Sequence, residues 1–328
     1  MRPGFSRRDL LLGSLGLLAV GCTGSADKRP LPTALERRVR PGPPRPSDLA
    51  PLTAEAGPEL VLMTNYGAGA AGTSIVTTVY ADGRVLRVRN MGMFGESEPD
   101  KPALVLARAG PARIAVLQAL VDRQEFLYSS SAYHEPNVHD GGSTSFYGGS
   151  VRRRILVIND PPDLPSTLRE LGVEVTHLQE WLDRIGVDAF TVQDGIVLEQ
   201  SRRFTSGHGD TLIVYADGML DYRINRGDLA ITPDGDDPYP IVTTRRVDGA
   251  HVQPLVAALQ TLRATEMPPH PRDLPERYRG TVHFLKSREL SASWDIQQPP
   301  PPPLERVLLE TAWLRAIFDA PPDEASKS

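Results

Sequence analysis

The chain has 328 residues, 40% of them hydrophobic and 23% charged, which is typical of a folded protein and argues against a disordered chain or a multi-span membrane protein. Its acidic side chains outnumber its basic ones by 41 to 36, and removal of residues 1–21 leaves 40 against 33. This balance argues against a nucleic-acid partner and against adsorption to anionic lipid, since both require a basic face.

The first 22 residues have the layout of an export signal. Arg2, Arg7 and Arg8 form a cationic start, and the uncharged run from Leu10 to Val20 follows them. A helix of that length rises only about 16 Å, roughly half of a bilayer core. We therefore expect residues 1–21 to be a cleavable signal peptide and not a permanent membrane span.

Two resemblances refine this prediction. Ser6 to Leu11, with its Arg7-Arg8 pair, resembles the twin-arginine export motif, which implies that the protein crosses the membrane already folded. Ala19-Val20-Gly21-Cys22 resembles a lipobox, which a signal peptidase cuts just before a cysteine that carries acyl chains such as palmitate. Cys22 is the only cysteine, so it has no disulfide partner within the chain.

The resemblance implies a bacterial lipoprotein, attached to an envelope membrane through Cys22 and facing outward or into the periplasm. The alternative is an ordinary secretory signal with an incidental cysteine. After Cys22 we expect a proline-rich linker over 22–57, which at about 3.1 Å per residue could hold the body on the order of 100 Å from the bilayer. A first module at 58–187, a second at 188–319 and a disordered tail at 320–328 complete the predicted organisation.

In the first module the pattern predicts strands at 59–66, 74–80 and 84–89, with a glycine-rich loop at 67–72 and a tight hairpin at Asp82-Gly83. A helix follows, with one apolar face formed by Ile114, Leu117, Leu120 and Val121. A hairpin at 143–147 and 154–158 then precedes a closing amphipathic helix that contains Trp181.

The second module follows the same order, with strands at 196–204, 211–215 and 220–224, a helix at 252–262, a hairpin at 281–285 and 290–296, and a final helix at 304–318. Three short matches recur in both modules: Val79–Gly83 with Val214–Gly218, Leu117–Leu120 with Leu259–Leu262, and Trp181–Ile185 with Trp313–Ile317. We therefore expect an α+β fold of two tandem repeats, each an antiparallel sheet with helices on one face in the order β-β-β-α-β-β-α.

The element order, the glycine loop after the first strand and the Asp82-Gly83 hairpin resemble a group of small bacterial domains that includes emfourin. Phe126-Leu127 and Asp140-Gly141-Gly142 also fit that pattern. Emfourin inhibits thermolysin-like metalloproteases, so the resemblance implies that inhibition of a protease is one form that the function could take. It implies no particular inhibitory residue.

The segment from His134 to Asp140 is a candidate metal site. A helical zinc motif needs two histidines four residues apart, whereas His134 and His139 are five apart with Pro136 between them. A loop site formed by His134, His139 and Asp140 remains as an alternative to an ordinary polar loop.

We expect no cofactor and no catalysis, because the serine-hydrolase elbow and the phosphate-binding loops do not occur in the sequence. The predicted role is a non-catalytic binding protein with an unknown envelope or secreted partner. The alternatives are a metal-dependent enzyme and a passive envelope scaffold. The predicted binding loops contain Gly67, Gly69, Gly72, Gly207, His208 and Gly209, since glycine lets a partner's backbone approach closely.

Overall fold

The computed structural model describes residues 54–68, 73–90, 103–134, 142–150, 152–159, 161–203, 208–226, 241–264, 267, 282–288, 290–295 and 298–319. The chain divides into two units, Met1–Pro43 and Pro44–Ser328, and every described residue belongs to the second. The predicted signal peptide, with Arg7, Arg8 and Cys22, lies outside the described residues. Among these residues, no helix combines the length and the apolar character that a membrane span requires.

The first sheet has eight strands in the order β6-β8-β7-β2-β3-β4-β5-β9. These strands are β2 (Leu60–Ala68), β3 (Thr73–Tyr80), β4 (Arg84–Asn90), β5 (Leu104–Arg108), β6 (Ala132–His134), β7 (Ser143–Gly148), β8 (Arg153–Ile158) and β9 (Val187–Asp188). Neighbouring strands are antiparallel except for β6, which is parallel to β8.

The second sheet has seven strands in the order β1-β13-β12-β11-β10-β14-β15, and all of their pairings are antiparallel. These strands are β1 (Glu55–Ala56), β10 (Ile196–Arg203), β11 (His208–Tyr215), β12 (Met219–Arg226), β13 (Ile241–Arg246), β14 (Val282–Lys286) and β15 (Ser291–Asp295). The fold is therefore α+β with two sheets in which antiparallel pairing dominates.

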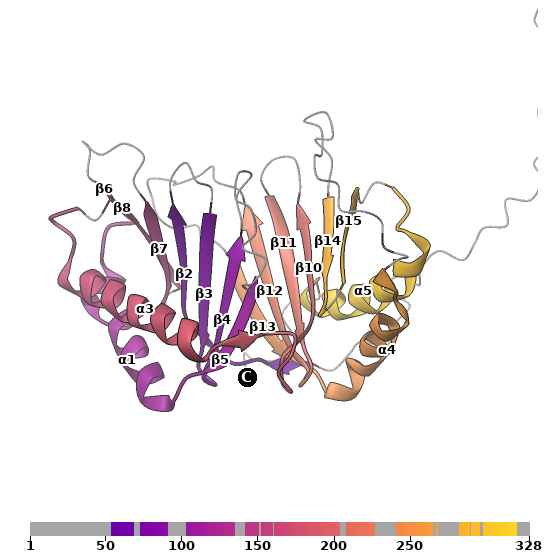
Figure 1. Ribbon diagram of the computed structural model, residues 1–328. Helices are drawn as coiled ribbons and strands as arrows, with labels where there is room; N and C mark the ends of the chain where they lie inside the picture. Colours follow the sequence, from indigo (N-terminus) through magenta and orange to yellow (C-terminus); the bar gives the residue numbers. More distant parts are fainter. Residues whose placement is uncertain are drawn as a thin grey trace, which may run out of the picture. The chain divides into compact units, whose positions relative to one another are not determined.

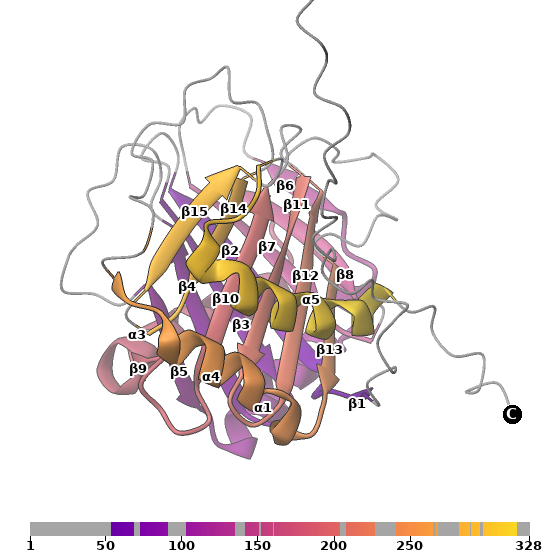
Figure 2. The same ribbon diagram turned by 90° about the vertical axis from the view of Figure 1, so that its right-hand side faces the viewer.

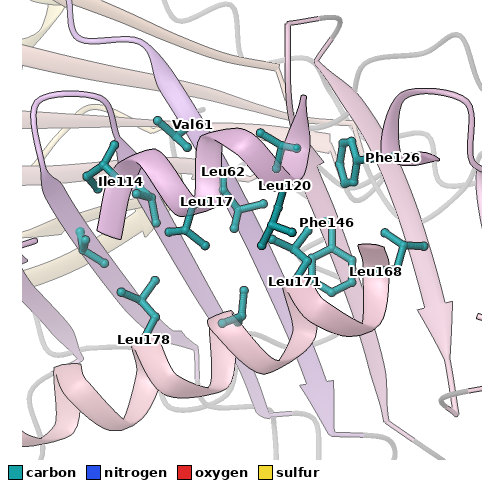
Figure 3. Close-up of a cluster of buried hydrophobic side chains, with 14 of the residues drawn as sticks. Val61, Leu62, Ile114, Leu117, Leu120, Phe126, Phe146, Leu168, Leu171 and Leu178 are labelled. Atoms are coloured by element: carbon teal, nitrogen blue, oxygen red, sulfur yellow. The ribbon is translucent and has the colours of Figure 1, made fainter. Parts of the chain in front are cut away.

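Helices cover one face of each sheet (Figure 1). The helices are α1 (Pro111–Val121), α2 (Gln124–Leu127), α3 (Ser166–Ile185), α4 (Gln253–Thr261) and α5 (Glu305–Asp319), with 3₁₀ turns η3 (Gly249–His251) and η5 (Pro302–Leu304). Leucines of α1 and α3 pack on Val61, Leu62 and Phe146 of the first sheet (Figure 3). In the same way, α4 and α5 pack across the second sheet (Figure 2).

The opposite faces of the two sheets share one apolar cluster. The first sheet contributes Leu60, Met63, Tyr80 and Leu86 to it, and the second contributes Ile196, Ile213, Tyr215 and Met219. The described body thus has four layers, in the order helices, sheet, sheet, helices. Each sheet is buried on both faces, which explains why β2 has the run Leu60 to Met63 instead of a strict alternation of apolar and polar residues.

The strands and helices that we predicted at 59–66, 74–80, 84–89, 143–147 and 154–158 and around Ile114 and Trp181 are confirmed. The structure adds a fourth strand before the first helix in each half, β5 and β13, together with β1, β6 and β9. Glu55 and Ala56 lie in the range predicted as linker but pair with Arg246 and Arg245 of β13. The residues that enter the second half, Val187 and Asp188, pair with β5 of the first.

Candidate functional site

The connections that lead into the predicted binding loops leave both sheets at corresponding ends. In the first sheet, β2 ends at Ala68, β4 ends at Asn90 and β7 begins at Ser143. In the second, β10 ends at Arg203 and β12 ends at Arg226. We call these strand ends the loop end. The other end, the hairpin end, has the tight turns at Asp82-Gly83 and Asp217-Gly218, in which Gly83 and Gly218 have φ angles of 90° and 85°.

A buried ion pair joins the two hairpin ends. Arg84, 1% exposed, donates from Nη1 to Oδ1 of Asp217 across the interface at 3.2 Å. Its guanidinium carbon also lies 5.0 Å from the centre of the Tyr215 ring, and its Nε lies 2.9 Å from Oδ2 of Asp82. Because the hairpin ends meet here, the loop ends of the two sheets lie on the same side of the body (Figure 1).

A second polar contact lies deeper between the sheets. Asp221 of β12 is fully buried, and its Oδ2 accepts a hydrogen bond from the Tyr80 hydroxyl of the first sheet. Arg223 donates from Nε to the same oxygen at 3.0 Å and from Nη2 to the Tyr80 hydroxyl oxygen at 3.1 Å. Burial, followed by the charge of Asp221, raises the pKa of Tyr80 far above its ordinary value, so the hydroxyl stays protonated and donates.

The sequence-predicted site residues that are described all lie at the loop end. Gly67 is the last residue but one of β2 and pairs with Ser74 and Ser143. His134, exposed, is the last residue of β6 and pairs with Ile158. Since Ile158 pairs with Ser143 in turn, His134 and Gly67 stand in one row, three strand spacings or about 14 Å apart.

His208 and Gly209 begin β11, where they pair with Arg226 and Asn225. The remaining predicted residues of the loops and of the candidate metal site, Gly69, Gly72, His139, Asp140 and Gly207, lie outside the described residues. Over the described part of the chain, no group of three or more His, Cys, Asp or Glu side chains is placed to hold a metal ion.

A row of charged and aromatic side chains crosses the second sheet near its loop end. The strand register places Asp210, Arg202, His283 and Trp294 directly opposite one another on four successive strands. They share the sheet face with Leu212 and Leu198, which α4 and α5 cover. The row therefore lies on the helix-covered face of the second sheet, near its loop end.

Asp210 is the centre of this row. Its Oδ1 accepts from Arg202 Nε at 2.9 Å and from Arg315 Nη1, of helix α5, at 2.6 Å. Its Oδ2 accepts from Arg202 Nε at 3.0 Å and from the Tyr222 hydroxyl at 3.1 Å. Burial would raise the pKa of Asp210, but the hydrogen bond from Arg202 and the charges of both arginines lower it below its ordinary value. The carboxylate is therefore ionised at neutral pH.

Arg315 fastens α5 to the sheet. Besides its bond to Asp210, it donates from Nε to Gln200 Oε1 at 2.7 Å and from Nη2 to the Gln200 carbonyl at 3.0 Å. Tyr222 stacks on Phe318, one turn further along α5, with 4.9 Å between the ring centres. Every nitrogen of the Arg315 guanidinium is thus bonded, and the residue serves as an anchor for the helix.

His283 stands beside Arg202 on the neighbouring strand. Its ring is stacked on Trp294 with 4.5 Å between the ring centres and an interplanar angle of 8°. The residue is 8% exposed, and its Nε2 is buried with no hydrogen-bond partner among the residues that the structure describes. Burial, with the positive charges of Arg315 and Arg202, lowers the pKa of His283 to about 3, so the ring is neutral at neutral pH.

The sequence patterns did not predict the cluster of Arg202, Asp210, His283 and Arg315. The alternation of side chains along a strand would have identified the first two as residues of a buried face. Arg202 lies on the same face of β10 as the buried Leu198, and Asp210 lies on the same face of β11 as Leu212 and Val214. A charged residue on the buried face of a strand is rarely found without a partner.

A separate groove of about 480 Å³ runs between α1 and α3 on the helical side of the first sheet. Its apolar lining includes Val116 and Val173, which are each about half exposed. Arg123 of α1 and Glu170 of α3 form an ion pair, 2.6 Å between Nη1 and Oε2, at its rim. This pair joins the two helices.

No family model matches the chain, and no curated protein is significantly similar to it.

Proposed function

We propose that this chain is a lipid-anchored envelope protein that binds a partner at the loop end of its body and catalyses no reaction. The observation that carries the proposal is the placement of the loop end. Connections from both sheets leave on the same side, and the Arg84–Asp217 and Tyr80–Asp221 contacts hold the two sheets together. Loops carried on a rigid scaffold are a frequent location of binding sites.

Two tyrosines offer a matched test. Tyr66 lies at the loop end, where it pairs with Ile75 and Thr144, and it is 42% exposed. Tyr128, 81% exposed, follows α2 near the hairpin end, where the Leu127 carbonyl accepts a hydrogen bond from Arg153 at the start of β8. We expect photoreactive benzoylphenylalanine to crosslink the partner in intact cells from position 66 and not from position 128. Partner crosslinks confined to position 128 would refute binding at the loop end.

The membrane attachment rests on the resemblance of Ala19–Cys22 to a lipobox. In this proposal Cys22→Ser moves the protein from the membrane fraction to the soluble fraction, and Arg7→Lys with Arg8→Lys blocks its export. Fractionation and mass spectrometry of the mature N-terminus measure both effects. An unmodified thiol at Cys22 in the native protein would remove the anchor from the proposal.

Inhibition of a secreted metalloprotease is the narrower form of the proposed function, and its support is the emfourin-like element order. The mature chain with Cys22→Ser, titrated against a thermolysin-like protease, tests it. Stoichiometric loss of hydrolysis would support inhibition. Unchanged hydrolysis at excess would exclude inhibition of that protease and leave the wider binding role to the crosslinking test.

We also propose that the body is one unit built twice. In support, the strand order β9-β5-β4-β3-β2-β7-β8 of the first sheet corresponds strand by strand to β1-β13-β12-β11-β10-β14-β15 of the second. A register irregularity follows Leu60 in β2 and Ile196 in β10, at matching places. The strand that enters each half pairs with the edge strand of the other half, β1 with β13 and β9 with β5. Superposition of the two halves in an experimental structure is the test.

A further inference from the structure

Arg202 and His283 are neighbours on adjacent strands near the loop end of the second sheet. The two residues are directly opposite each other on β10 and β14, on the same face of the sheet. Side chains in such a pair have their Cβ atoms about 5 Å apart. The stacking of His283 on Trp294 fixes the plane of the imidazole ring.

The charges in this cluster do not balance. Asp210 is the one carboxylate that the described residues bring into contact with Arg202 and Arg315, so two guanidinium groups share a single negative charge. Arg315 uses all of its nitrogens within the protein, whereas Arg202 uses Nε and Nη2 on Asp210 and has a partly exposed side chain, at 34%. Within the described part of the chain, no acceptor contacts the Nη1 group of Arg202, which is therefore the donor that remains for an external acceptor.

His283 supplies the second, independent observation. A buried polar atom without a partner is rare, because it destabilises a protein by about 1–3 kcal/mol, and its retention calls for an explanation. Nε2 of His283 is such an atom. The neutral ring can carry its proton on Nε2, and in that form it is a second donor beside Arg202.

We propose that Arg202 and His283 bind one oxyanion, a carboxylate or a phosphate group carried by the partner. The partly exposed Arg202 donates to it first from Nη1, and Nε2 of His283, which is covered in the free protein, donates once the side chains around it move aside. The charge of the oxyanion balances the second guanidinium of the cluster. Hydrogen bonds from a charged donor to an oxyanion are about twice as strong as neutral ones, which suits Arg202 as the main contact. The inference rests on the proposed binding role of the loop end, and it names the chemistry that this end recognises.

The test uses the mature chain with Cys22→Ser and two probes, acetate for the carboxylate and inorganic phosphate for the phosphate. We expect saturable changes in the NMR signals of the His283 ring and the Trp294 indole with one of the probes. Arg202→Gln weakens the apparent affinity about tenfold through the lost charged hydrogen bond. The matched control, Arg108→Gln, removes an exposed arginine that pairs with Asp194 and leaves the affinity unchanged.

His283→Phe separates a binding role from a structural one. Phenylalanine keeps the stacking on Trp294 and removes the unpartnered nitrogen, so we expect a stable protein with a raised Tm that no longer responds to the anion. The proposal is overturned if neither probe gives a saturable change in the unaltered protein, or if His283→Phe responds like it. Crosslinking from Tyr66 depends on neither outcome, so a failure of the anion site and a failure of the binding role are told apart.

Discussion

Asp221 is the residue on which the polar contact between the sheets depends most. Its carboxylate is fully buried and accepts from both Tyr80 and Arg223. Asp221→Asn keeps the shape and removes the charge, which leaves Arg223 without its counter-ion in the interior. We expect a loss of about 3–5 kcal/mol in the free energy of unfolding, measured with urea.

The control for Asp221 is Asp194→Asn, because Asp194 forms an ion pair with Arg108 in which both side chains are about half exposed. An exposed pair of this kind contributes at most about 1 kcal/mol. Equal losses in the two variants would show that the interface does not depend on its buried charge.

Substitution of two glycines by alanine should have opposite effects on stability. Gly83 has a φ of 90°, and a Cβ there would lie 2.7 Å from the Ala109 carbonyl oxygen, so Gly83→Ala should destabilise the protein by about 1–3 kcal/mol. Gly172 lies in helix α3, and a Cβ there meets nothing within 4 Å. Gly172→Ala should stabilise the protein by about 0.5–1 kcal/mol. Chemical unfolding of both variants checks the order, and the reverse order would contradict it.

For single residues, the sequence predicted the tight turn at Gly83, because an aspartate-glycine pair between strands is a local signal. It did not predict the cluster around Asp210. Arg315 lies 105 residues from Asp210, and their contact exists only once α5 packs across the second sheet. The alternation of side chains along β10 and β11 could have identified Arg202 and Asp210 as buried charges, but a single sequence does not identify their partner.

Among the elements, helix α3 depends on a carboxylate from outside its own sequence. Pro165 precedes the helix and offers no side-chain cap. Glu125 of α2 instead accepts from the backbone nitrogens of Ser166 and Thr167, at 3.1 Å each. The hydrogen bond from the Thr167 hydroxyl, followed by that from its backbone nitrogen, lowers the pKa of Glu125 below its ordinary 4.5.

A lowered pKa in the folded state means that Glu125 stabilises the fold above its ordinary pKa, and that this contribution is lost as the pH falls through the lowered value. We therefore expect Glu125→Gln to reduce Tm at neutral pH and to differ little from the unaltered protein in strong acid. Thermal unfolding followed by circular dichroism from neutral to acid pH measures this. Glu180→Gln, on the exposed side of α3, is the control, and a deficit for Glu125→Gln that persists in strong acid would contradict the capping role.

The long elements were predictable because their patterns are strong, as in β3, where six of eight residues are Val, Ile or Thr within a strand bounded by glycine and a tight turn. The short ones were not. β5 has a brief apolar run, Leu104 to Leu106, which is compatible with either a strand or a buried helix segment. β1 and β9 have two residues each, and only pairing with a distant strand makes them strands.

Across the whole body, the two sheets share an apolar layer and the Tyr80–Asp221 and Arg84–Asp217 contacts, so neither sheet has a complete core without the other. The proposed binding role uses this directly, because loop ends that are held together can contact one partner at the same time. The sequence predicted two modules, but it did not predict that they pack face to face. That arrangement depends on Tyr80, Arg84, Asp217 and Asp221, whose positions in the sequence carry no signal of their partners.

We therefore expect the two halves to form one cooperative body. Differential scanning calorimetry of the mature chain with Cys22→Ser measures this most directly. We predict a single transition in which the calorimetric and van't Hoff enthalpies agree, a ratio of about one. Two resolved transitions, or a calorimetric enthalpy well above the van't Hoff value, would show instead that the halves unfold independently.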